Sequence, residues 1–173
     1  SFTCHLCGAN VTHHVVKRSY LMTSDPNEAI PSEISADLNS ALALHRGGKL
    51  DDAVRIYQSA LRRAPGNALV LLSLGAALLG LGRTRDAVTP LEAALASRPD
   101  HPDTCFTLAE AYRAEGRIEE AYLAAKTGLE GNPDYLQGRV AMADALLDMG
   151  CHDDARAAFE DILDKNPNNM TAL

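Results

Sequence analysis

The residues best suited to chemistry lie at the N-terminus, where Cys4 and Cys7 form a CxxC pair. Two thiolates at this spacing can approach one metal ion from a tight turn, and Gly8 after the second cysteine permits the bend. A structural zinc site takes four ligands, and two histidines follow shortly after the pair. We therefore expect the candidate zinc ligands to be Cys4, Cys7, His13 and His14. Adjacent histidines rarely both face one metal, so one or two histidines complete the site, and His5 within the turn is a further candidate.

Other interpretations of this segment remain open. Residues 2–8 resemble a zinc knuckle, but the second CxxC of a usual zinc ribbon is missing, so a further pair would lie upstream or in a second molecule. A redox pair is less favoured because no strand-then-helix context follows, and a pair of thiols in a plain tail is the third alternative. Attachment of c-type haem is excluded because Gly8, not histidine, follows Cys7.

Elsewhere the sequence shows no catalytic constellation. Phosphate loops of the GxxxxGK[ST] type and HExxH motifs are absent, and no set of serine, histidine and acid stands out. His101 and His152 fall in predicted turns, where a solvated histidine is the commoner interpretation. Pairs of acids recur where second helices are expected to start, and there they complement the helix dipole. We expect no enzymatic activity from this chain.

Composition and charge exclude some classes of protein. The 173 residues (18.5 kDa) are 46% hydrophobic and 23% charged, as in globular domains, and the formal net charge is −7. An acidic chain is a poor general binder of nucleic acid, and the longest uncharged stretch, 64–82, is interrupted by proline and glycines, unlike a membrane span. Residues 34–67 carry a net charge of +2 and residues 102–169 carry −8. This polarity suits a basic partner or head-to-tail association, or serves only solubility.

An internal repeat of 34 residues decides the predicted fold. Three columns recur without gaps: Gly48, Gly82, Gly116 and Gly150; Ala53, Ala87, Ala121 and Ala155; and Pro65, Pro99, Pro133 and Pro167. Each glycine can take the positive φ that ends a first helix, each alanine allows two helices to cross closely, and each proline marks the end of a second helix. Apolar residues recur between these positions at helical spacing.

These units resemble tetratricopeptide repeats over residues 34–169, nearly four-fifths of the chain. The resemblance implies an all-α fold, an α-solenoid of four antiparallel helix pairs forming a right-handed superhelix. The repeats are 34–67, 68–101, 102–135 and 136–169, after an N-terminal segment of residues 1–33. The expected helices are 34–46, 51–63, 68–80, 85–97, 102–114, 119–131, 136–148 and 153–165.

This sequence departs from the family pattern at several positions. Asp37, Leu71, Cys105 and Arg139 replace the tryptophan usual in the first helix, and Gly128 replaces a usual alanine, which we expect to loosen the third unit. Residues 170–173 resemble the start of a missing capping helix, so we expect the chain to continue or a neighbour to cover that end.

In this family the first helix of each pair lines a concave groove. Carried over residue by residue, the resemblance implies a groove formed by Leu38, Leu42, Leu69, Leu72, Ala76, Leu79, Phe106, Glu110, Arg113, Val140, Asp144 and Asp148. Its N-terminal half is apolar and its C-terminal half acidic, although some of the leucines could instead be ordinary core between helices. The basic cluster with which some members hold a partner's C-terminal carboxylate is absent, since Leu38, Leu42, Ser73, Asp103 and Thr107 occupy its positions.

The resemblance implies a non-catalytic interaction module, an adaptor or scaffold that binds a helix or peptide with an apolar stripe and a basic flank. Two alternatives are the targeting part of a larger enzyme, suggested by the missing cap and by Ser1 in place of methionine, and a zinc-dependent regulator. Association of two copies through the uncapped end or the N-terminal segment is a further expectation. Four cysteines, one CxxC pair and two residues far apart, do not make a dense disulfide framework. This favours a reducing cytoplasmic setting and leaves a periplasmic one open.

Overall fold

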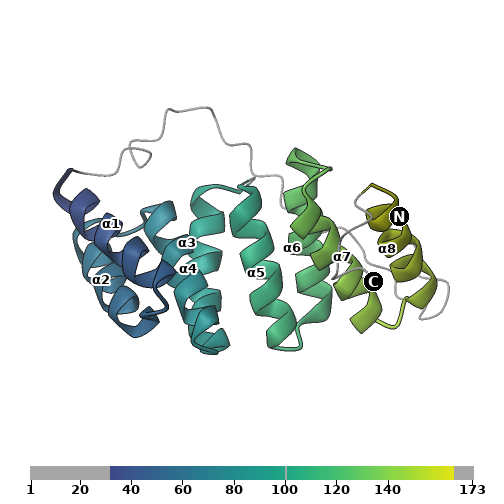
Figure 1. Ribbon diagram of the computed structural model, residues 1–173, viewed down its shortest axis with the longest axis horizontal. Helices are drawn as coiled ribbons and strands as arrows, with labels where there is room; N and C mark the ends of the chain where they lie inside the picture. The colour runs from purple at the N-terminus through teal and green to yellow at the C-terminus, as the bar shows by residue number, and fades with distance from the viewer. Residues whose placement is uncertain (1–31, 100, 166–173) are drawn as a thin grey trace.

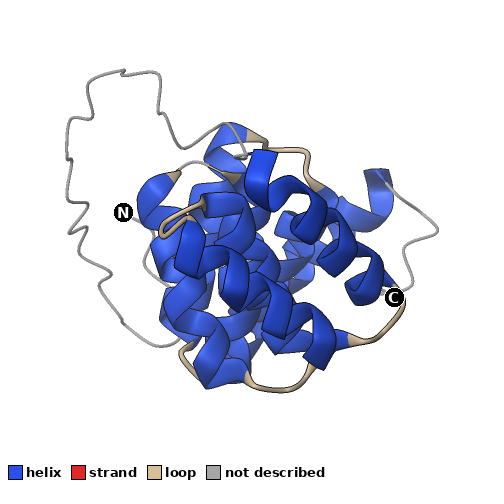
Figure 2. Cartoon of the chain, turned by 90° about the vertical axis from the view of Figure 1, so that its left-hand side faces the viewer, coloured by secondary structure: helices blue, strands red, loops and turns tan. Residues whose placement is uncertain are grey.

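The computed structural model describes residues 32–99 and 101–165, and within these ranges the chain forms eight helices and no strand (Figures 1 and 2). The helices are α1 (Ser32–Arg46), α2 (Leu50–Arg63), α3 (Ala68–Gly80), α4 (Thr84–Ser97), α5 (Pro102–Ala114), α6 (Ile118–Gly131), α7 (Leu136–Asp148) and α8 (His152–Lys165). The predicted all-α helical-repeat fold is therefore confirmed. The expected bounds of α3, α5 and α7 are correct, whereas each second helix begins one residue earlier than expected.

The turn inside each pair is built around the glycine of the first column. Gly48, Gly82, Gly116 and Gly150 all have φ between 71° and 76°, in the left-handed region. The residue after each glycine donates its backbone N–H to a carbonyl five residues earlier, as from Lys49 to Leu44 at 2.9 Å. This is the bonding pattern of a Schellman motif, which satisfies carbonyls at the end of the first helix. The predicted role of the glycine column is confirmed.

The eight helices form two rows. Among the described residues, α1 contacts α3, α3 contacts α5 and α5 contacts α7, whereas none of α2, α4, α6 and α8 contacts another of its own row. Helices that approach one another closely must lie on the inside of a curved stack. The first helices of the pairs therefore form the concave row and the second helices the outer row.

The alanine column lies where the helices of a pair cross. Ala53, Ala87, Ala121 and Ala155 are each at most 1% exposed. The core around α1 to α4 is filled by large residues such as Ile34, Tyr57, Leu74 and Leu91, whereas the smaller cluster between α5 and α6 centres on Ala109, Ala124 and Ala125. Large side chains are also buried further along the array, at Leu108 on α5 and Ile162 on α8. No described helix is long and apolar enough to cross a lipid bilayer.

Enlarging a residue of the alanine column should destabilise the fold. Ala87→Leu forces extra methyl groups into a site that is fully buried, and we expect a loss of about 1–3 kcal/mol in the free energy of unfolding. Ala93→Leu, an exposed position on the same helix, is the control and should be nearly neutral. Urea denaturation followed by circular dichroism measures both, and equal stabilities would contradict the assigned crossing.

Candidate functional site

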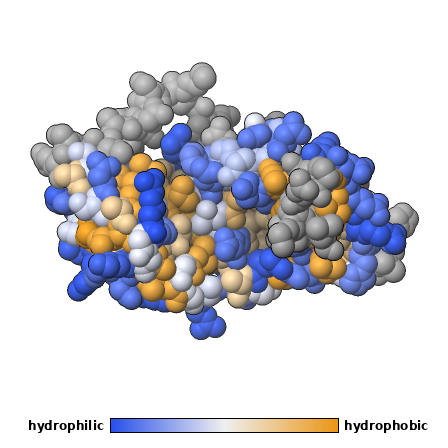
Figure 3. Space-filling model, viewed as in Figure 1, coloured by the Kyte–Doolittle hydropathy of each residue, from blue (hydrophilic) through white to orange (hydrophobic). Residues whose placement is uncertain are grey.

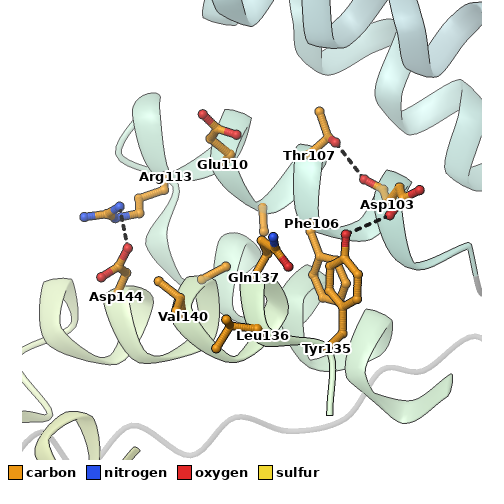
Figure 4. A pocket seen from close by; sticks show the side chains of 12 residues that line it. Asp103, Phe106, Thr107, Glu110, Arg113, Tyr135, Leu136, Gln137, Val140 and Asp144 are labelled. Carbon is orange, nitrogen blue, oxygen red and sulfur yellow. Dashed lines mark hydrogen bonds and ion pairs between the residues drawn. The ribbon is translucent and has the colours of Figure 1, made fainter. Parts of the chain in front are cut away.

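A pocket of about 620 Å³ opens on the concave face between α5 and α7 (Figure 4). Its walls combine aromatic, aliphatic and charged side chains, and nearly all come from the two facing inner helices. The lining residues are Asp103, Phe106, Thr107, Ala109, Glu110, Arg113, Tyr135, Leu136, Gln137, Val140, Ala141 and Asp144. The pocket thus lies in the third and fourth repeats, in the half of the groove that was expected to be acidic.

One end of the pocket is an aromatic wall. The rings of Phe106 and Tyr135 stack with centroids 4.8 Å apart and an interplanar angle of 7°. Phe106 fits because two neighbouring helices carry glycine there: a Cβ on Gly128 would lie 2.7 Å from the ring, and one on Gly138 only 2.3 Å away. The ring therefore occupies space that any larger residue at these positions would take.

This packing changes the interpretation of Gly128. The sequence suggested a glycine that loosens the third unit, but the structure places the buried Phe106 ring, 8% exposed, over it. The absence of a Cβ is a requirement of the packing here, whatever it costs in helix propensity.

The other end of the pocket is an ion-pair cluster that joins the two helices. Arg113 on α5 donates from Nε to Asp148 Oδ2 at 2.5 Å and from a terminal nitrogen to Asp144 Oδ2 at 3.0 Å. Figure 4 places the Arg113–Asp144 pair at the end opposite the stacked rings. Two of the three acids assigned to the groove are therefore bound to its own arginine.

Charge and burial act together on these groups. Burial raises the pKa of Asp144, an effect that outweighs the opposite pull of Arg113 and is reinforced by Asp148. The hydrogen bond to Asp148 raises the pKa of Arg113, so the guanidinium stays charged. Burial, with the bond to Asp103, raises the pKa of Tyr135, whose hydroxyl donates to Asp103 Oδ1 at 3.1 Å. The tyrosine thus remains a donor at neutral pH.

The C-terminal half of the predicted groove is brought together by the structure. Phe106, Glu110, Arg113, Val140 and Asp144 all line the pocket, and Asp148 is attached to it through Arg113.

Of the residues predicted for the N-terminal half of the groove, some lie at the surface and others in the core. Leu69 is 41% exposed, whereas Leu42, Leu72 and Leu79 are partly buried and pack against the core. Ala76 is half-buried, and Leu38, only 2% exposed, is a core residue that no partner can reach. On the face seen in Figure 3, hydrophobic surface gathers over the α1–α4 half, and hydrophilic surface prevails around α8.

The prediction missed residues that depend on the turn before α7. Tyr135 is the residue preceding that helix and Leu136 is its first residue, so neither falls on the inner-helix positions carried over from the family. A signal was present: Gly128 and Gly138 both lack a side chain, and aromatic residues occur on either side of Gly128 in the sequence. Glycine lets another group approach the backbone closely, but the sequence alone does not say which ring does so.

The candidate zinc ligands Cys4, Cys7, His13 and His14 lie outside the described residues. Within residues 32–99 and 101–165, no group of three or more His, Cys, Asp or Glu side chains is arranged to hold a metal ion.

Comparison with protein-family models gives two matches. The model of anaphase-promoting complex, cyclosome, subunit 3 matches residues 80–162, and a tetratricopeptide repeat model matches residues 44–89. No curated protein matches the sequence.

Several solved structures are similar in fold to this chain. A crystal structure of MamA protein is 22% identical, with a TM-score of 0.74 and coverage of 80% of this chain and 76% of that chain. A tetratricopeptide repeat protein from Parabacteroides merdae is 20% identical, with a TM-score of 0.70 and coverage of 80% and 56%. The first tetratricopeptide repeat of Spaghetti (RPAP3), bound to the HSP90 peptide SRMEEVD, is 17% identical, with a TM-score of 0.66 and coverage of 68% and 93%.

The fold and these likenesses define the class as an all-α helical-repeat protein. Within that class, the two sequence matches support a tetratricopeptide-repeat protein.

A methyl group added at Gly138 tests the contact between α7 and the Phe106 ring. Gly138→Ala gains about 1 kcal/mol of helix propensity, but its Cβ meets the Phe106 ring at 2.3 Å. We expect overpacking to prevail, with a net loss of about 1–3 kcal/mol in the free energy of unfolding.

The double variant Phe106→Leu/Gly138→Ala provides the control, because a smaller side chain makes room for the methyl group. A thermodynamic cycle from urea denaturation should give a double-variant loss well below the sum of the two single losses. Additive losses, or a stabilised Gly138→Ala, would contradict the packing described.

Proposed function

We propose that this chain is a non-catalytic protein-interaction module whose concave face binds a helix or peptide of a partner protein. The observation that carries the proposal is the pocket between α5 and α7, which opens on the inner row of a helical-repeat array. Such a pocket combines apolar walls with a few placed charges, the usual composition of a recognition site. In the Spaghetti structure, a peptide is bound to a repeat array of similar fold.

The charged groups of the pocket suit recognition better than catalysis. Arg113 is held by Asp144 and Asp148, and Asp103 accepts the Tyr135 hydroxyl, so these groups fix the shape of the site. The similarity to tetratricopeptide repeats supports the same interpretation.

The partner segment is proposed to combine an apolar stripe with a basic flank. Leu69, with the partly exposed Leu72 and Leu79, supplies apolar surface towards the N-terminal end. Asp103 and Glu110, both exposed, supply negative charge at the pocket. A peptide lying along the inner row would therefore bury its leucine-like side chains near α3 and present its cations to α5.

An acidic tail is not the proposed ligand. The positions at which some family members carry a basic carboxylate-binding cluster are held here by Leu38, Leu42, Ser73, Asp103 and Thr107. Leu38 and Ser73 are buried, and Asp103 would repel a carboxylate. This chain is therefore proposed to differ in ligand from the array that holds the peptide SRMEEVD.

The module would serve equally as the targeting part of a larger enzyme, since the groove and its ligand would be the same. Self-association is a separate proposal, with the N-terminal segment or the C-terminal end of the array as the contact.

Selection from a random peptide library displayed on phage, with the full chain as bait, tests the proposed function. The recovered peptides should be both apolar and basic. Leu69→Asp should weaken their binding about 10-fold or more, mainly by faster dissociation, because one side chain loses its apolar burial. Leu123→Asp is a matched control, since Leu123 is 40% exposed but lies on the outer row. Surface plasmon resonance compares the two, and equal effects would place binding away from the concave face.

We also propose, on the CxxC spacing alone, that Cys4 and Cys7 bind zinc with histidine ligands. Elemental analysis of full-length protein purified without chelator should give about one zinc per chain, or half that for a shared site. Cys4→Ser/Cys7→Ser should abolish the metal and leave the helical circular dichroism signal unchanged, because residues 34–165 bury their own core. Metal retained by the double variant, or absent from the parent, would overturn the assignment and with it the zinc-dependent regulator.

A further inference from the structure

We infer that the pocket between α5 and α7 receives an arginine side chain of the partner, and that Asp103 and Glu110 are the carboxylates that bind its guanidinium. The inference rests on the proposed function and deepens it, since it names the chemical group that the site recognises. Four charged groups line the pocket: Asp103, Glu110 and Arg113 on α5, and Asp144 on α7.

The acids of α7 are already engaged. Arg113 spans the gap between the helices and binds Asp148 at 2.5 Å and Asp144 at 3.0 Å. Among the described residues, no salt bridge joins Asp103 or Glu110 to a basic side chain, although the charge of Glu110 also helps to raise the pKa of Arg113. Glu110 lies seven residues after Asp103, so the two occupy one face of α5, about 10 Å apart along the helix. A cation entering the pocket from the partner therefore meets the acids of α5.

Asp103 is held ready to accept a donor. Its Oδ1 accepts the Tyr135 hydroxyl at 3.1 Å, which fixes the carboxylate beside the aromatic wall. An ionised carboxylate has acceptor sites for more than one donor, so this bond leaves capacity for a guanidinium. Figure 4 shows Asp103 and the two rings at the same end of the pocket.

The walls favour arginine over lysine. Phe106, Tyr135, Leu136 and Val140 supply apolar and aromatic surface along which a long alkyl stem can pack. A guanidinium is planar, weakly hydrated, stacks on aromatic rings and can bond a carboxylate with two nitrogens. An ammonium is compact and strongly hydrated, so it gains less in such a site.

The net charge selects against acidic ligands. Asp103, Glu110 and Asp144 outnumber Arg113 in the lining, which leaves the pocket negative. Arg113 moderates this charge and holds α7 to α5, so removing its charge should increase the attraction for an incoming cation.

The probe for this site is Nα-acetylarginine N-methylamide, with the citrulline analogue as its neutral isostere, titrated into the full chain and followed by amide NMR shifts. We expect saturable shifts confined to the pocket residues of α5 and α7, weakening as salt is raised. Citrulline should bind at least about 10-fold more weakly.

Two double variants, each of which removes two negative charges, distinguish an effect of Asp103 and Glu110 from an effect of the net charge of the protein. Asp103→Asn/Glu110→Gln should weaken arginine binding at least about 5-fold. Glu160→Gln/Asp164→Asn, which removes two exposed acids of α8 outside the pocket, should leave it unchanged. Equal weakening in both variants, equal binding of citrulline, shifts mapped elsewhere, or no saturable binding would each overturn the inference.

The chain's own N-terminal segment is the competing occupant, since it contains Lys17 and Arg18 among apolar residues. If Lys17→Gln/Arg18→Gln tightens arginine binding about 10-fold or more, the pocket is filled from within the chain and the partner assignment is wrong. An unchanged affinity supports the partner.

Failure of this inference is distinguishable from failure of the proposed function. Selected peptides that depend on Leu69 but tolerate citrulline in place of arginine would overturn the arginine site alone. Peptides that keep their affinity for the Leu69→Asp variant would instead contradict binding at the concave face, whether or not they need arginine.

Discussion

Close approach of neighbouring helices is the constraint on which the rest of this structure depends. Where the helices of a pair cross, Ala53, Ala87, Ala121 and Ala155 are at most 1% exposed. A second column, at Ala41, Gly75, Ala109 and Ala143, is also buried, and a Cβ on Gly75 would lie 2.4 Å from the Leu91 side chain. Because each helix packs only on near neighbours, these local fits repeated four times produce the whole array.

The concave site is a consequence of the same packing. The inner helices contact one another while the outer helices do not, so the stack curves and presents the faces of α1, α3, α5 and α7 to a ligand. Within that curve, Phe106 packs against Gly128 and Gly138, and Tyr135 stacks on it. Small residues therefore allow helices to cross at one set of positions, and at Gly128 and Gly138 they make room for the aromatic wall of the pocket.

Electrostatics divides the pocket into a part that maintains the fold and a part that can act on a ligand. Arg113 ties α5 to Asp144 and Asp148 of α7, and burial raises the pKa of Asp144 in spite of that arginine. Leaving the half-buried Asp144 without its arginine would cost folding free energy, so this cluster resists rearrangement. The exposed acids of α5 form no salt bridge among the described residues, and Asp103 keeps acceptor capacity beyond its bond to Tyr135, which is why we assign recognition to them.

The sequence by itself determined the helices, their turns and the repeat. Glycine at positive φ, alanine at a crossing and proline after a helix each act through backbone or neighbouring sterics, so a 34-residue period is enough to place them. It also placed Phe106, Glu110 and Val140 on the inner row. Tertiary structure alone decided that Leu38 is core while Leu69 is surface, and that Arg113 bonds acids 31 and 35 residues away. Burial and ion pairing depend on which faces meet across helices, and the repeat period carries no information about the reach of an individual side chain.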